Sequence, residues 1–150
     1  MSDSVIIIPT YNEIENVESM TRTVMAFEKD FHILYVDDNS PDGTADKVLE
    51  LQAEFPGRIH LEKRAGKLGL GTAYIHGFKW AIARDYEYIF EMDCDFSHNP
   101  KDLIRLYDAC VAGADLSIGS RYCKGGKVSN WPLKRVLMSY FASVYVRMIL

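Results

Sequence analysis

A chain of 150 residues with 48% hydrophobic and 25% charged side chains is long enough to bury a core, and its composition excludes a disordered protein. Its net charge of −4 argues against a nucleic-acid-binding protein, which would usually be basic. The cysteines, at positions 94, 110 and 123, lack metal-site spacing, so we expect reduced thiols in a cytoplasmic compartment.

The chain alternates two kinds of segment. Short β-branched or aromatic runs predict strands, and longer segments with apolar residues at helical spacing predict helices. The predicted strands are residues 5–8, 32–36, 58–62, 86–92 and 115–119. Helices are predicted over 13–29, after Ser40-Pro41, over a segment that buries Leu70, Ala73, Gly77 and Ala81, from Asn99-Pro100, and from about Pro132. Asn12 and Ser40 are expected to cap the first two helices.

This alternation predicts βαβ units, and therefore an α/β fold with a mainly parallel central sheet. The last helical pattern reaches Leu150 without a residue that would end it. We therefore expect the chain to be the N-terminal part of a longer protein. No stretch has the eighteen or so apolar residues that a transmembrane helix needs, and no signal peptide is expected.

Polar side chains follow four of the predicted strands. In open α/β sheets, ligands bind beyond the carboxyl ends of the strands. The residues delivered there are Tyr11 and Glu13, Asp37 and Asp38, Asp93 and Asp95, and Arg121. Their convergence predicts a single active site at one edge of the sheet.

Asp93 and Asp95 are the clearest metal candidates. If the strand persists past Met92, both carboxylates project to the same side. Two neighbouring anions repel each other unless a cation lies between them, and Mg²⁺ or Mn²⁺ with substrate phosphates fits such a pair. The alternative is a solvated acidic turn before the helix that starts near Pro100.

Two nucleotide-binding motifs are excluded, and one other enzyme class stays open. The turn after the first strand is Pro-Thr-Tyr-Asn-Glu, without the glycines of a dinucleotide site, and Gly66-Lys67-Leu68 lacks the Ser or Thr of a P-loop. The run Asp93-Cys94-Asp95-Phe96-Ser97 also resembles the nucleophile loop of haloacid-dehalogenase-like phosphatases. In that family, however, the loop follows the first strand.

A set of motifs spread over nearly the whole chain resembles a known family, the polyprenol-phosphate mannosyltransferases (dolichol-phosphate mannose synthases). The motifs are Pro9-Thr10-Tyr11-Asn12-Glu13, residues 37–44 (Asp-Asp-Asn-Ser-Pro-Asp-Gly-Thr), Gly69-Leu70-Gly71 with Ala73-Tyr74, Asp93-x-Asp95-x-Ser97-His98-x-Pro100, Ser120-Arg121-Tyr122, and Trp131, Arg135 and Ser139. The first motif and Asp-x-Asp mark only the broad glycosyltransferase family, and the others narrow the resemblance. It implies an inverting enzyme of GT-A fold, a Rossmann-like three-layer sandwich.

The resemblance also implies a role for each matching residue. It assigns Pro9, Tyr11, Glu13, Val36 and Asp38 to the nucleotide pocket, and Asp93, Asp95 and Ser97 to the Mg²⁺ or Mn²⁺ ion. It assigns Arg121, Arg135 and Ser139 to the acceptor phosphate, with Asp95, Arg121 and Arg135 as the catalytic set. Asp37 is interpreted as structural, Cys94 as a buried thiol, and His98 as a loop residue, not a base. Lys124, Lys127 and Lys134 are interpreted as a basic rim toward anionic lipid, or as a merely solvated loop.

The implied reaction moves mannose from GDP-mannose to a polyprenyl (dolichyl or undecaprenyl) phosphate with inversion. The implied location is the cytoplasmic face of a membrane, and no nucleic-acid partner is expected. Other hypotheses stay open: a GT-A enzyme with another nucleotide sugar, such as UDP-glucose, or another acceptor, and an inactive nucleotide-binding module.

Overall fold

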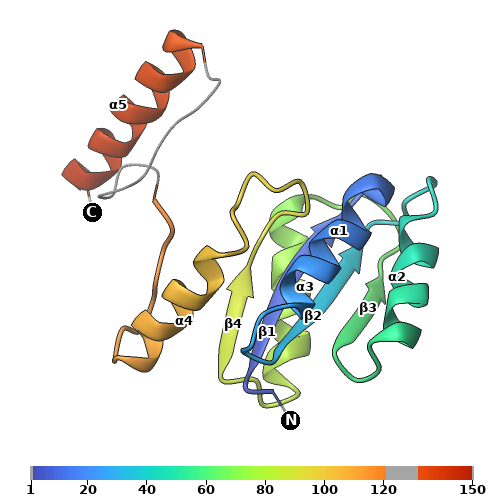
Figure 1. Ribbon diagram of the computed structural model, residues 1–150. Coiled ribbons are helices and arrows are strands. Elements are labelled where there is room, and N and C mark those ends of the chain that lie inside the picture. The colour runs from blue at the N-terminus through green and yellow to red at the C-terminus, as the bar shows by residue number, and fades with distance from the viewer. Residues whose placement is uncertain (1, 121–131, 150) are drawn as a thin grey trace. The chain divides into compact units, whose positions relative to one another are not determined.

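The computed structural model describes residues 2–120 and 132–149 of the chain (Figure 1). The chain divides into two compact units, Met1–Ser117 and Ile118–Leu150. The first contains β1 (Ser4–Thr10), α1 (Ile14–Met25), β2 (Phe31–Asp37), α2 (Thr44–Glu54), β3 (Ile59–Lys63), α3 (Leu70–Ile82), β4 (Tyr88–Glu91) and α4 (Asp102–Val111). The second contains α5 (Leu133–Ile149). None of the helices in these described ranges is long and apolar enough to cross a membrane.

The four strands form a parallel sheet in the order β3-β2-β1-β4, which confirms the predicted α/β class. The chain builds β1, β2 and β3 in one direction and then returns to place β4 on the other side of β1. This reversal makes a switch point at the carboxyl ends of β1 and β4, where such sheets bind ligands.

Helices cover both faces of the sheet, so the unit has three layers (Figure 1). Side chains alternate along β1: Ile6 and Ile8 join the core shared with α1, α2 and α4, whereas Val5 and Ile7 join the core shared with α3. Because β1 is buried on both faces, its sequence is a continuous apolar run and not an alternating one. The three-layer sandwich expected from the sequence is therefore confirmed for this unit.

Pro9 lies inside β1, not after it, although proline cannot donate a backbone hydrogen bond. The carbonyl of Ile7 accepts the last ladder bond on the β4 side, from the amide of Met92 at 3.2 Å. Alternation turns the Pro9 nitrogen to that same side, beyond the end of β4. No donor of the sheet is therefore lost.

Gly77 allows α3 to approach β1 closely. A Cβ atom at this position would lie 2.6 Å from Cγ2 of Ile7, which is fully buried. We expect Gly77→Ala to lower the free energy of unfolding by about 1–3 kcal/mol, the usual cost of overpacking. Chemical denaturation measures this change.

Gly71→Ala is the matched control for Gly77→Ala, because Gly71 lies on the same helix and has no atom within 4 Å of an added Cβ. This substitution is expected to leave stability unchanged or to raise it by up to about 1 kcal/mol through helix propensity. Equal destabilisation by both substitutions would contradict the packing explanation.

Four details of the sequence prediction are wrong. α1 ends at Met25 and not at residue 29, and its N-cap is Glu13, not Asn12. Leu70 is 58% exposed because it is the first residue of α3 and lies beyond the sheet. Ser40 does not cap α2, whose N-cap is Gly43 with a left-handed φ of 90°.

The strand predicted at residues 115–119 is also absent. No strand of the described ranges pairs with the free edge of β4, and Leu116 and Ile118 are 73% and 75% exposed. A strand forms where its backbone groups find partners, and the apolar alternation of this segment does not supply them. The apolar alternation alone therefore misled the prediction here.

A cluster of rings lies at the opposite end of the sheet from the predicted site. The His32 ring lies 5.7 Å from His60, and the His60 ring lies 4.9 Å from Trp80. Burial lowers the pKa of His32 and of His60. The charged or titratable groups beside them are Asp30, Arg58, Arg84 and Tyr86.

This cluster predicts that acid weakens the fold. Because both pKa values are depressed in the folded state, the unfolded chain binds more protons as the pH falls through the ordinary histidine value of 6.5. The stabilisation that comes from keeping both histidines neutral is fully present above that pH and is lost as the pH falls below it. We expect His60→Phe to reduce the difference in urea midpoint between about pH 7.5 and about pH 5.5. An unchanged difference would contradict the prediction.

Candidate functional site

One cavity of about 260 Å³ opens at the carboxyl ends of β1, β2 and β4. It lies at the switch point of the sheet, where the sequence predicted the site. Its lining joins aromatic and apolar groups to four carboxylates and one lysine. The lining residues are Pro9, Thr10, Tyr11, Glu13, Asp38, Lys67, Leu70, Ala73, Asp93, Cys94 and Asp95.

The loop after β2 holds the loop after β1 in place. The hydroxyl of Ser40 accepts the amide of Asn12 at 3.0 Å, and the hydroxyl of Thr44 accepts the amide of Glu13 at 2.9 Å. Asp42 accepts the amide of Ile14 at 3.1 Å. These side chains thus satisfy the free amides that begin α1, and they fix the backbone beside Tyr11.

Asp37 is fully buried and organises this loop, as the sequence indicated. Its carboxylate accepts hydrogen bonds from the hydroxyl of Thr10 at 3.0 Å, and from the amide and hydroxyl of Ser40 at 2.9 and 2.6 Å. A buried carboxylate needs such donors. Its role is structural, because it does not line the cavity.

Asp38 forms a buried ion pair with Arg64, a residue that the sequence analysis missed. Nε of Arg64 lies 2.5 Å from one carboxylate oxygen, and a terminal nitrogen lies 2.7 Å from the other. The same guanidinium donates to the hydroxyl of Thr72 at 2.7 Å. The sequence shows Arg64 directly after a predicted strand and before a glycine-rich loop. No spacing rule, however, connects an arginine in that position to Asp38.

Asp93 and Asp95 line the cavity together, but not for the reason predicted. β4 ends at Glu91, so the two residues lie on a turn beyond the strand and not within it. Phe96, with a φ of 58°, continues that turn. The amide of Ser97 donates to Asp95 at 2.9 Å, and this hydrogen bond holds the pKa of Asp95 below its ordinary value.

Neighbouring side chains position Asp93. The Tyr74 hydroxyl of α3 donates to its carboxylate at 3.2 Å, and burial together with this anion raises the pKa of Tyr74. The amide of Asp93 donates to the ring of His98 at 3.3 Å, so His98 acts within the loop. Cys94 is 2% exposed, and burial raises its pKa to about 12. The prediction of a buried thiol is therefore confirmed.

The donor set fits a divalent cation that is completed by substrate. Asp93 and Asp95 offer two carboxylates in one cavity, and the side chain of Asp93 is 40% exposed. The described ranges hold no group of three or more acidic, histidine or cysteine ligands. Mg²⁺ and Mn²⁺ accept such a site, because they take remaining ligands from phosphates and water.

Two predicted site residues of the first unit, Val36 and Ser97, do not line the cavity. Val36 is fully buried in the core that also contains Ala73, and so lies beneath the lining. Ser97 borders Asp95 but does not line the cavity. Arg135 and Ser139 stand four residues apart on α5, in the second unit. Arg121, Lys124 and Lys127 lie outside the described residues.

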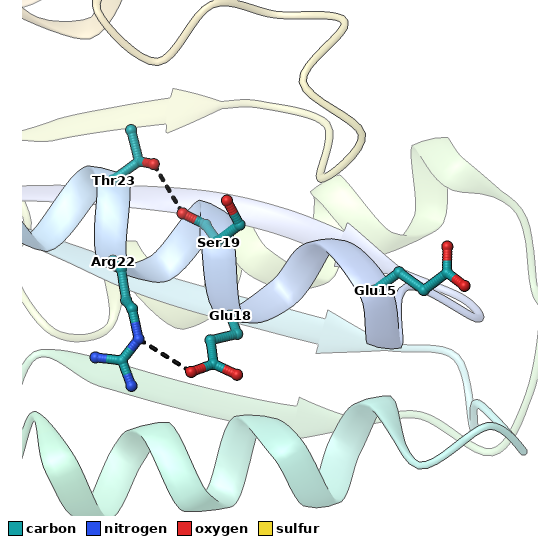
Figure 2. Close-up of a pocket in the computed structure, with 5 residues that line it drawn as sticks. All are labelled: Glu15, Glu18, Ser19, Arg22 and Thr23. Carbon is teal, nitrogen blue, oxygen red and sulfur yellow. Dashed lines mark hydrogen bonds and ion pairs between the residues drawn. The ribbon is translucent and has the colours of Figure 1, made fainter.

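A larger hollow of about 590 Å³ lies along α1 (Figure 2). Its lining comes from that helix alone: Glu15, Glu18, Ser19, Arg22 and Thr23. Glu18 and Arg22 pair with each other at 3.0 Å, and Thr23 bonds the carbonyl of Ser19. Groups that satisfy one another along the exposed face of one helix do not converge on a ligand, so the smaller cavity is the candidate site.

Comparison with known proteins identifies the family of the chain. The family described as "Glycosyl transferase family 2" matches residues 5–147. The chain is 49% identical, over 147 residues, to a polyprenol monophosphomannose synthase of Mycolicibacterium smegmatis, and the match covers 98% of this chain and 56% of that protein. It is 46% identical to an undecaprenyl-phosphate mannosyltransferase of Micrococcus luteus, with coverage of 96% and 58%. The chain thus spans little more than half the length of these relatives.

A solved structure supports the fold. The crystal structure of residues 1–349 of S. aureus TarS matches 75% of this chain and 32% of its own, with a TM-score of 0.57 and 21% sequence identity. At that identity the likeness concerns the fold alone.

Proposed function

This chain belongs to glycosyl transferase family 2, and from that premise we propose that it transfers mannose from GDP-mannose to a polyprenyl phosphate with inversion. The observation that carries the proposal is the shared cavity of Tyr11, Asp38, Asp93 and Asp95 at the switch point of the sheet. The activities named for the relatives at 46–49% identity supply the donor sugar and the class of acceptor.

The nucleotide pocket is proposed at the ends of β1 and β2. Tyr11 is 39% exposed and offers a ring face to a base, and Pro9, Glu13 and Asp38 line the same cavity. Arg64 orients the carboxylate of Asp38 but leaves lone pairs on both oxygens, which can accept hydrogen bonds from a base or ribose. Val36 supports this pocket from the core.

The donor diphosphate is proposed to lie against Asp93 and Asp95. These two carboxylates would hold Mg²⁺ or Mn²⁺, and Ser97 would orient Asp95 through its amide. The bound ion supplies Lewis-acid stabilisation to the departing nucleoside diphosphate. Tyr74 keeps the Asp93 carboxylate directed into the cavity.

The acceptor phosphate is proposed to bind Arg121, Arg135 and Ser139. A guanidinium matches a phosphate in shape and charge, and residues four apart on a helix share a face. Because a phosphate is already anionic at neutral pH, its oxygen can attack the anomeric carbon without a strong base. The proposal therefore gives His98 no role as a base, and its ring accepts the amide of Asp93 within the loop.

We also propose that the 150 residues form the N-terminal and central part of the catalytic domain, since the relatives extend well beyond the match. Because the proposed acceptor is a lipid, we propose that the reaction takes place at a membrane, on its cytoplasmic face. Lys134, which is exposed at the start of α5, is proposed to belong to a basic rim facing lipid headgroups.

Nucleotide preference tests the proposed function. Thermal-shift titrations of the chain with GDP, UDP, GDP-mannose and UDP-glucose in the presence of Mn²⁺ are expected to show the largest stabilisation with the guanine nucleotides. Preferential stabilisation by UDP would contradict GDP-mannose as the donor and indicate a uridine nucleotide sugar. No stabilisation by any nucleotide would contradict a donor site.

A further inference from the structure

Lys67 lies over the ring that is proposed to receive the base. Its Nζ atom lies 4.5 Å from the centroid of the Tyr11 ring, and both residues line the cavity. A cation at this distance is attracted to the electron-rich face of the ring. The contact therefore holds an ammonium group inside the site.

The charges around the cavity are unbalanced. Four carboxylates line it, and Asp38 is neutralised by Arg64 outside the lining. Arg64 directs its guanidinium nitrogens to Asp38, Thr72 and Gly69, so it is not directed toward a ligand. Among the described lining residues, Lys67 carries the one positive charge.

The segment Ala65–Gly69, here called the strap, is fixed at both ends. The amide of Arg64 donates to the carbonyl of Asp37 at 2.8 Å before the strap begins. After it, the hydroxyl of Thr72 donates to the carbonyls of Leu68 and Gly69 at 3.0 and 2.7 Å. Lys67 stands in the middle of the strap, so the fixed ends keep its backbone beside the cavity, and the ring of Tyr11 contacts its exposed side chain.

We propose that Lys67 is a further donor-binding residue, whose ammonium group binds the diphosphate of the nucleotide sugar. The inference rests on the proposed function. It assigns the diphosphate to the one positively charged side chain among the described lining residues. A diphosphate brings negative charge into a cavity of carboxylates, so a fixed ammonium group beside it offsets repulsion that the carboxylates alone would create. Lysine commonly binds phosphate as a point charge.

Ligand truncation separates a diphosphate contact from a contact with the base. The binding of GDP, inorganic pyrophosphate and guanosine, each with Mn²⁺, is measured by calorimetry for the unsubstituted chain, Lys67→Gln and Lys67→Arg. We expect Lys67→Gln to lower the affinity for GDP and for pyrophosphate by about tenfold, which is the effect of one charge-assisted contact. The affinity for guanosine is expected to fall by less than about twofold. Lys67→Arg is expected to retain most of the affinity.

Lys63→Gln is the matched control, because Lys63 ends β3 just before the strap, is half exposed and does not line the cavity. It is expected to change none of the three affinities. If Lys67→Gln lowered the affinities for guanosine and GDP equally, or lowered neither, the inference about Lys67 would be overturned, whereas the proposed function would stand. Failure of the unsubstituted chain to bind any of the diphosphates would overturn the proposed function and the inference with it.

Discussion

Arg64→Met is expected to lower the free energy of unfolding by about 3 kcal/mol, the low end of the range for breaking a buried ion pair. The side chains of Arg64 and Asp38 are only 7% and 10% exposed, and Arg64 contacts both carboxylate oxygens. Methionine fills much of the same space but leaves the Asp38 anion without its partner. Urea denaturation measures the loss.

The matched control for this prediction is Arg22→Met. Arg22 also forms a two-point ion pair, with Glu54 at 2.7 and 3.0 Å, but both side chains are about half exposed. Solvent screens such a pair, so its removal is expected to change stability little. The double variant Asp38→Asn/Arg64→Met should recover part of the loss. A loss no larger than that of Arg22→Met would contradict the structural role of Arg64.

Asp95→Asn is expected to reduce the proposed mannose transfer by about 100-fold in the presence of Mg²⁺ or Mn²⁺, comparable to the loss of one group that stabilises developing charge. The substitution removes a negative charge from the cavity but keeps an oxygen that can accept the Ser97 amide. The loop and the stability are therefore expected to persist. Radioactive mannose in the lipid fraction, with GDP-mannose as donor, gives the rate.

Asp46→Asn serves as the control for the transfer assay, because Asp46 is 83% exposed on α2 and lies outside the cavity. It removes the same charge and should leave transfer unchanged. Full transfer by Asp95→Asn with the ion present would show that the metal assignment is wrong.

The fold was largely predictable because β-branched runs and helical spacing repeat along the first 111 residues. The order in which polar residues follow β1, β2 and β4 also predicted that they meet at one edge of the sheet, where most of them line one cavity. Periodicity failed at residues 115–119, where Leu116 and Ile118 alternate as in a strand but lie exposed. A strand depends on a partner, which local sequence does not contain.

Other features of the site depend on contacts between distant segments. Ser40 was expected to cap the helix that follows it, yet its hydroxyl accepts the amide of Asn12 just before α1. Thr44 and Asp42 likewise accept the amides of Glu13 and Ile14. The Arg64 pair joins residues 26 positions apart in the chain. Such pairings need the assembled sheet, because only the fold brings the two loops together.

The central claim, that Asp93 and Asp95 hold a divalent ion together with a nucleoside diphosphate, is tested most directly by electron paramagnetic resonance of Mn²⁺. The signal of free Mn²⁺ is expected to fall when GDP and the unsubstituted chain are added together, beyond the loss caused by GDP alone. With Asp93→Asn or Asp95→Asn, the signal should remain at the level of GDP alone. Equal Mn²⁺ binding by the unsubstituted chain and both variants would contradict the claim.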